Sequence, residues 1–280
     1  MVVKHIFKLL PLVLFVSGCN GVIPDKGGNI QVETGRDVSR TEISRHGDPN
    51  STQKALVIGN STYEYSPLRN PVNDARAMTT QLVKMGFDVT QATDINDDDM
   101  TKAVKTFGEL LSKTPNGSVA LFYFSGHGAQ VDGRNFLIPT NNNDVHGETE
   151  LKKVALDAQT ILAMMEQNNA GMNFMILDAC RNNPYQGSEK NLSRGLARVE
   201  PPRGALVAFA TASGEIAKDG DGLHGVYTEH LLQALSNAQH KRIEDVFMNV
   251  RNAVSSETAE KQKPWYRASL TKPFCFGGCR

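Results

Sequence analysis

Short apolar runs that alternate with helix-like segments limit the fold of this chain more than any other feature. Six runs have the length and composition of strands, and they cover residues 55–58, 87–93, 118–124, 174–177, 205–210 and 265–270. Segments with the apolar spacing of amphipathic helices lie between them, over residues 71–85, 96–111, 157–167, 227–235 and 243–254. This order predicts an α/β fold with a mostly parallel sheet of about six strands, helices on both faces and the last strand at an edge.

Length and charge narrow the function classes. The chain has 280 residues, of which 40% are hydrophobic, so it can build one sizeable core. Its 30 basic and 30 acidic side chains balance, which gives no reason to expect nucleic acid or another polyanion as a partner.

The N-terminus resembles a bacterial lipoprotein signal. Lys4 and Lys8 precede a run of apolar residues that is too short to span a membrane, and residues 16–19 read Val-Ser-Gly-Cys, which resembles a lipobox. The resemblance implies that residues 1–18 are removed and that Cys19 is acylated. The alternatives are an ordinary signal peptide or a cytosolic protein with an apolar start.

A segment without apolar periodicity follows, and we expect residues 19–52 to form a flexible tether. The lipoprotein interpretation places the protein in the bacterial cell envelope, facing the periplasm and attached to a membrane only through its lipid. Asn20 favours the outer membrane, because inner-membrane retention usually involves aspartate after the lipidated cysteine.

Two reactive side chains follow buried strands. His127 comes after the strand at 118–124, and Cys180 comes after the strand at 174–177. Parallel strands carry ligands and chemistry at their carboxyl ends, so the two groups are expected to meet there. An imidazole can take the proton of a thiol and activate it as a nucleophile. Gly126 and Gly128 predict a tight turn around the histidine, and the amides of Gly128 and Cys180 are candidates for an oxyanion hole.

Each of these residues also has an ordinary interpretation. A single buried cysteine is usually inert packing, and a single histidine is usually a satisfied polar group; their joint placement after two strands favours catalysis. Neither has a second cysteine or histidine at the short spacing typical of zinc sites, so we expect no metal there.

Several segments together resemble a known family. They read KALVIGNSTY from Lys54, RNPVNDARAM from Arg69, SGHG from Ser125, LDACRNNP from Leu177, VAFATASGEIAKDGDG from Val207 and TEHLLQAL from Thr228. In this order they resemble the caspase fold of cysteine peptidases, in its metacaspase-like and paracaspase-like branch, over residues 54–272. The resemblance implies a caspase-like three-layer sandwich over residues 53–272, with 273–280 as a C-terminal tail. It also implies that His127 is the general base and that Cys180 is the nucleophile of a cysteine endopeptidase acting on proteins or peptides.

Asp178 separates this chain from aspartate-specific caspases, which have glutamine two residues before the nucleophile. An acid at this position resembles metacaspases and paracaspases, where it binds arginine or lysine of the substrate. A carboxylate beside the nucleophile also attracts a basic side chain and repels an acidic one on physical grounds. Asp219 and Asp221 are further candidates for this pocket. The alternative is a strand-end carboxylate bonded to nearby amides.

The segment from Arg181 to Arg203 has no apolar pattern and is expected to be an exposed loop. If the enzyme cleaves after basic residues, it can cut itself in this loop, where the candidate sites are Lys190, Arg194, Arg198 and Arg203. A solvated loop that is never cleaved is the alternative.

We expect no cofactor. Calcium activates some metacaspases, and acids crowd around the start of one predicted helix at Asp94, Asp97, Asp98 and Asp99. Such residues more often cap a helix and favour its dipole, as Asn96 would here.

Cys275 and Cys279 suggest a small disulfide, a bond between chains, or a thiol redox function. The redox function is the least favoured, because their spacing departs from Cys-x-x-Cys. A caspase-fold binding module without activity is the other alternative. The oligomeric state does not follow from the sequence.

Overall fold

The computed structural model describes residues 23–24, 30–31, 42–168, 171–180, 196–212 and 222–279, with only the backbone at 23–24, 30–31 and 180. Two short strands, β1 (Ile23–Pro24) and β2 (Ile30–Gln31), pair antiparallel in a separate unit, Met1–Val38. The other strands and all the described helices belong to the second unit, Ser39–Arg280.

The main sheet has the strand order β11-β10-β9-β6-β4-β5-β3. Five inner strands are parallel, namely β10 (Ala205–Phe209), β9 (Met172–Cys180), β6 (Val119–Val131), β4 (Gln53–Gly59) and β5 (Asp88–Thr93). The edge strands β11 (Trp265–Ala268) and β3 (Glu42–His46) run antiparallel to their neighbours. The predicted α/β sheet and its last strand at an edge are confirmed.

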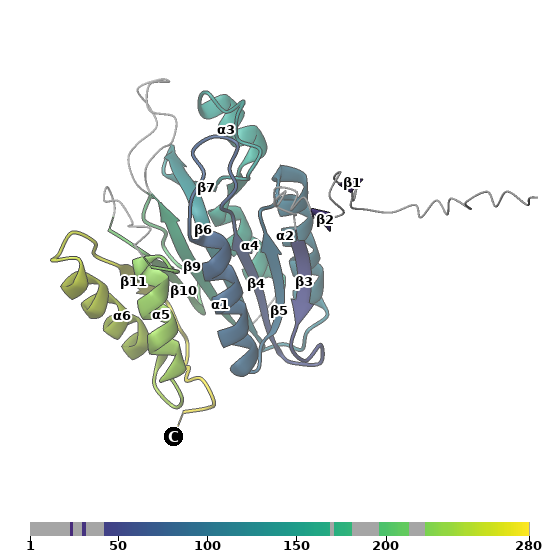
Figure 1. The fold of residues 1–280 in the computed structure, drawn as a ribbon. Coiled ribbons are helices and arrows are strands. Elements are labelled where there is room, and N and C mark those ends of the chain that lie inside the picture. The colour runs from purple at the N-terminus through teal and green to yellow at the C-terminus, as the bar shows by residue number, and fades with distance from the viewer. Residues whose placement is uncertain are drawn as a thin grey trace, which may run out of the picture. The chain divides into compact units, whose positions relative to one another are not determined.

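Helices cover both faces of this sheet (Figure 1). One face carries α1 (Pro71–Lys84), α5 (Val226–Ser236) and α6 (Ile243–Glu257), and the other carries α2 (Asp97–Ser112) and α4 (Ala158–Asn168). Alternate residues of each strand enter opposite layers: in β4, Val57 packs toward α1 and Leu56 toward α2. This burial on both faces explains why β4, β6, β9 and β10 contain continuous apolar runs.

A smaller layer extends beyond the main sheet. The last four residues of β6, Gly128–Val131, pair antiparallel with β7 (Arg134–Leu137). Strand β7 in turn pairs antiparallel with β8 (Leu156–Asp157). The short helix α3 (Glu148–Val154), which the sequence pattern did not indicate, buries Leu151 in this layer's core cluster.

Asn96 caps α2 as expected, since its side chain accepts a hydrogen bond of 2.8 Å from the amide of Asp99. The neighbouring acids also have structural partners. Asp94 accepts from the amides of Ser61 and Thr62 at 2.7 and 2.8 Å, and Asp97 accepts from the Asn141 side chain at 2.8 Å. In the described ranges, no three His, Cys, Asp or Glu side chains gather as a metal site would require.

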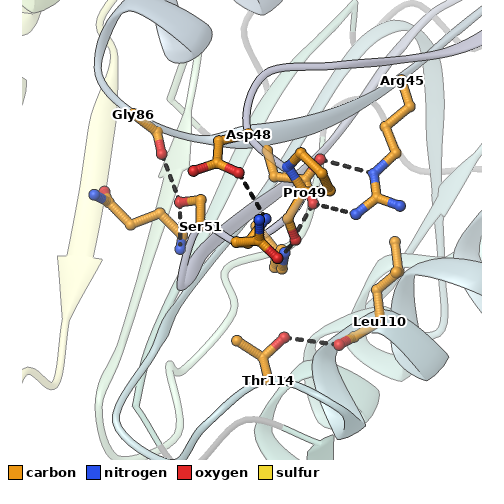
Figure 2. Close-up of polar contacts among 11 residues, drawn as sticks. Arg45, Asp48, Pro49, Ser51, Gly86, Leu110 and Thr114 are labelled. Atoms are coloured by element: carbon orange, nitrogen blue, oxygen red, sulfur yellow. Dashed lines mark hydrogen bonds and ion pairs between the residues drawn. The ribbon is translucent and has the colours of Figure 1, made fainter.

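The expectation that residues 19–52 form a flexible tether is wrong for the last part of that range, because residues 42–46 form β3. This strand has little apolar character, and an ion pair attaches it to the sheet. The Arg45 guanidinium donates to both carboxylate oxygens of Asp88 at 2.8 and 2.6 Å, and Lys54 Nζ donates to the same carboxylate at 2.8 Å. Figure 2 shows Arg45 directed at this cluster, near Pro49, whose carbonyl also accepts from Lys54.

This ion-pair cluster lowers the pKa of Asp88. Burial by itself raises the pKa of the carboxyl group, but hydrogen bonds from Arg45 and Lys54, together with their charges, outweigh it. Because the pKa is lower in the folded protein, the stabilisation is complete above the carboxyl group's unfolded pKa of about 4 and is lost as the pH falls through the folded value.

Asp88→Asn is therefore expected to lower the free energy of unfolding at pH 7 by about 3–5 kcal/mol, because Lys54 would remain buried without its charge partner. Denaturant unfolding measures this loss. The difference in unfolding free energy between variant and wild type should become smaller as the pH falls below about 4. Asp132→Asn is the control, since its partner Lys152 is solvent-exposed and the unfolding free energy should not change. An Asp88 variant as stable as wild type at pH 7 would contradict this account.

The C-terminal tail is packed onto the α1 and α5 face. Phe274 and Phe276 are buried, and the Phe274 ring lies 4.8 Å from that of Phe174 near the start of β9. Cys275 and Cys279 form a disulfide, which confirms that alternative. Phe174 precedes Cys180 by six residues in β9, about 20 Å along an extended strand, so the tail packs near the amino end of a strand whose carboxyl end carries Cys180.

None of the helices in the described part of the chain has the length and apolar character needed to cross a bilayer.

Candidate functional site

Strand register brings His127 and Cys180 side by side. β6 and β9 are parallel neighbours, and their register pairs Ser125 with Asp178, Gly126 with Ala179, and His127 with Cys180. Adjacent strands lie about 4.8 Å apart, so the two residues predicted to react with each other occupy neighbouring backbone positions, at the end of the β6–β9 pairing. The Cys180 side chain lies outside the described part of the structure.

His127 is held by the loop that follows β4. Its ring is buried, and Nε2 lies 2.6 Å from the carbonyl oxygen of Ser66. Since a carbonyl can only accept, Nε2 carries the proton, and Nδ1 is the ring atom that can take up another in the neutral histidine. The backbone amide of His127 donates to Tyr63 Oη at 2.7 Å, and the two rings lie 4.4 Å apart.

Sequence reasoning missed Tyr63 and Ser66 as partners of the histidine. Tyr63 stands in the motif that begins at Lys54, so its position was available, but its contact was not. Ser66 contributes a backbone carbonyl, for which side-chain identity gives no signal.

The tight turn expected around His127 is wrong, because β6 continues as a strand to Val131. The glycines instead permit close packing. Gly126 has φ +155°, and a Cβ there would lie 2.3 Å from Tyr63 Oη, so a side chain would displace the tyrosine that holds the histidine. A Cβ at Gly128 would lie 3.1 Å from that of Ala179. The oxyanion role of the Gly128 and Cys180 amides stays a prediction.

Asp178 lies within this site and is 9% exposed. Its Oδ2 accepts a hydrogen bond of 2.6 Å from Thr228 Oγ1, on α5. That hydroxyl has a single proton, so the Tyr123 hydroxyl, 2.5 Å away, donates to it. Burial raises the pKa of Tyr123 well above its usual value, and the charges of Asp74 and Asp178 raise it further, so the phenol stays protonated. The carboxylate is therefore oriented by a chain of two hydroxyl groups.

Asp74 is a second buried carboxylate that sequence reasoning missed. It projects from α1, accepts from Ser125 Oγ at 3.2 Å, and lies 3.0 Å from Nδ1 of His224. Ser125 is the register partner of Asp178, so Asp74 contacts the residue that lies beside Asp178 on the neighbouring strand. A signal was present, because Asp74 shares a helix face with Met78 and Leu82 at four-residue spacing. A charged residue on an otherwise buried face suggests a polar site.

Several predicted site residues lie outside the described residues, and they are Cys19, Lys190, Arg194, Asp219 and Asp221. Arg198 and Arg203 are described and exposed.

The expectation that all of 181–203 is an exposed loop is wrong for its last part. Leu196 and Val199 are buried in the α2 and α4 layer. The Ala197 amide donates to Asn135 Oδ1 at 2.6 Å, and its carbonyl accepts from Asn135 Nδ2 at 3.0 Å.

Comparison with known proteins agrees with this architecture. The profile of the caspase domain family matches residues 52–275. The mouse homologue of mucosa-associated lymphoid tissue lymphoma translocation protein 1 is 33% identical over 137 residues, which are 48% of this chain and 16% of that protein. The human protein is 33% identical over 128 residues, or 45% of this chain and 15% of that protein.

A probable protease from a Desulfuromonadales bacterium is 26% identical over 139 residues, or 45% of this chain and 16% of that protein. The matches thus span about one sixth of the length of these relatives, whereas the family profile covers most of this chain. The parallel sheet with helices on both faces and the extent of the profile match lead to one conclusion: this chain belongs to the caspase-domain family of peptidases.

Proposed function

We propose that this protein is a cysteine endopeptidase in which His127 activates Cys180 and which cleaves after arginine or lysine. The observation that supports the proposal is the register of β6 and β9, in which His127 and Cys180 are partner residues on neighbouring strands. Family membership supports a peptidase acting on protein or peptide substrates.

The chemistry follows from the tautomer of His127. Nδ1 takes the thiol proton, and the Cys180 thiolate attacks the carbonyl carbon of the peptide bond. The amides of Gly128 and Cys180 stabilise the resulting oxyanion. The imidazolium then returns its proton to the leaving amine, which gives an acyl-enzyme that water hydrolyses with His127 again as base. The Ser66 carbonyl supports each step, since it holds Nε2–H in place and favours the charged ring.

Two buried carboxylates support the preference for basic substrates. Asp178 lies on β9, two residues before Cys180, and Asp74 on α1 accepts a hydrogen bond from Ser125 of β6. A substrate guanidinium or ammonium group would compensate this negative charge, whereas an aspartate side chain would add to it.

Short peptides that end in arginine, lysine or aspartate before a fluorogenic amine test the proposal. Release after arginine or lysine and not after aspartate is expected. Release after aspartate alone would overturn the specificity. Absence of release from all three, with a Cys180 that resists alkylation by iodoacetamide, would favour a caspase-fold binding module.

Self-cleavage is expected at Lys190 or Arg194 and not at the two later candidates. Arg198 lies between two buried residues, Ala197 and Val199. The peptide bond after Arg203 is also held, because the Gly204 amide donates a hydrogen bond of 2.7 Å to the Ser269 carbonyl oxygen. Neither bond can therefore enter an active site without local unfolding. Purified protein should give two fragments, and the C-terminal fragment should begin at residue 191 or 195. Cys180→Ala protein should remain intact, and a cut after Arg198 or Arg203 would contradict the assignment.

A lipid on Cys19 would attach the enzyme to the bacterial envelope, as the lipobox resemblance implies. Full-length protein is expected in the membrane fraction, and a Cys19→Ser variant should lose the lipid mass. If the mature wild-type and Cys19→Ser proteins differ in mass only by the substitution, the lipid anchor is excluded.

A further inference from the structure

His224 lies just before α5, beside the buried carboxylate of Asp74. Its Nδ1 lies 3.0 Å from Asp74 Oδ1, and the two residues are 150 positions apart in the sequence. The His224 side chain is 26% exposed, whereas that of Asp74 is 2% exposed. An ionised carboxylate can only accept hydrogen bonds, so Nδ1 carries the proton and His224 is a donor to this acid. The proposed chemistry of the reactive pair gives this histidine no role.

Donors from two elements hold the carboxylate of Asp74 in one orientation. Oδ1 accepts from the His224 ring at 3.0 Å and from the Gly225 amide at 3.2 Å, and this amide also lies 3.4 Å from Oδ2. Oδ2 accepts from Ser125 Oγ on β6 at 3.2 Å. The contacts from the start of α5 therefore hold Oδ1 and turn Oδ2 toward β6, where Ser125 is the register partner of Asp178.

The start of α5 orients both of the buried acids. Gly225 is the N-cap residue of this helix, and Thr228, in its first turn, donates to Asp178 Oδ2 at 2.6 Å. His224 and Thr228 thus supply a side-chain donor to each of the two carboxylates that support the preference for basic substrates. A shift of either donor changes the negative charge that a substrate cation meets.

The contact between His224 and Asp74 also keeps the acid charged. Burial favours the neutral form of a carboxyl group, and each hydrogen bond donated to the carboxylate opposes that effect. Hydrogen bonds to an ionised group are among the strong ones in proteins, so the loss of the imidazole donor is costly to the charged form. The alternative is a contact that only fastens α5 to α1.

We propose that His224 is a positioning residue, which holds Asp74 ionised and oriented to bind the basic side chain of the substrate. The inference rests on the proposed function. It makes the preference for arginine or lysine depend on a histidine that acts through Asp74.

Substitutions can separate the ring of His224 from its donor. His224→Phe keeps a ring and loses Nδ1–H, whereas His224→Asn loses the ring and keeps an N–H donor near the position of Nδ1. His224→Phe should lower kcat/KM for an arginine peptide by about 10- to 100-fold relative to the matching citrulline peptide, because a hydrogen bond to a charged group is lost. His224→Asn should keep the arginine preference within about three-fold of the wild type. His224→Ala replaces His224→Phe if thermal unfolding shows that the latter is not folded.

His230→Phe is the matched control. His230 lies on the same helix, and its Nε2 is 2.7 Å from Glu257 Oε2 on α6. This variant also removes a histidine partner from a carboxylate, but away from Asp74, so the arginine preference should not change. Folded His224→Phe protein that keeps the wild-type preference, or that loses activity equally on arginine and citrulline, would overturn the inference and leave the proposed function standing. A His224→Asn variant as poor as His224→Phe would also overturn it.

Binding without catalysis separates the inference from the proposed function. Calorimetric titration of Cys180→Ala protein should show tighter binding of the arginine peptide than of the citrulline peptide, and His224→Phe in the same background should weaken only the former, by about ten-fold or more. This pattern without cleavage by the wild type would retain the role of His224 and overturn the proposed function. Equal binding of both peptides to Cys180→Ala protein, or a preference that survives His224→Phe, would overturn the role of His224.

Discussion

Cys180→Ala is expected to lower kcat for a peptide ending in arginine by about 10⁴-fold or more, because no other group can form the acyl-enzyme. His127→Ala should cause a loss of similar size. The double variant should be little worse than either single one, since a nucleophile and its base act as one unit. Initial rates of fluorogenic amine release measure all three.

The control for this experiment is the other pair of cysteines. Cys275→Ala combined with Cys279→Ala removes the disulfide, which is packed with the tail near the amino ends of the strands, and should leave kcat near the wild-type value. Thermal unfolding of each variant shows whether it is folded. Full activity of folded Cys180→Ala protein would rule out the proposed nucleophile.

Asp178→Asn is expected to lower kcat/KM for arginine and lysine substrates by about 10²–10³-fold, because it removes a charge beside the pocket and leaves the substrate cation without its partner. Asparagine is the sharpest replacement. Its amide oxygen can still accept from Thr228 Oγ1, so the hydroxyl chain from Tyr123 stays intact. The comparison is made with a peptide that carries citrulline, a neutral analogue of arginine, at the cleavage site.

Two outcomes separate specificity from structure. If Asp178 recognises the substrate cation, the variant loses activity on arginine and not on citrulline. If its role is only to hold α5 through Thr228, the asparagine keeps that hydrogen bond, neither substrate loses activity and the assignment fails. An equal loss on both substrates would also contradict the assignment. Asp132→Asn changes an exposed carboxylate elsewhere and should alter neither rate.

Local patterns predicted most of the architecture. Four inner strands, β4, β6, β9 and β10, are buried on both faces and contain uninterrupted apolar runs, which can be recognised in the sequence without knowledge of the neighbouring strands. The cap at Asn96 also follows from adjacent residues. Strand β3 could not be found in this way, because its sequence has little apolar character and its contacts, the pairing with β5 and the Arg45–Asp88 ion pair, join residues more than 40 positions apart.

The sequence by itself determined the α/β class, the presence of His127 and Cys180 just beyond two buried apolar runs, and the acid at Asp178. These depend on burial periodicity and on residue type, which are properties of short segments. Tertiary structure decided the rest. It brought Ser66 to His127, Thr228 to Asp178, and Asp74 to Ser125 and His224. Such contacts join residues that are tens to more than a hundred positions apart, so they depend on strand order and register rather than on any local pattern.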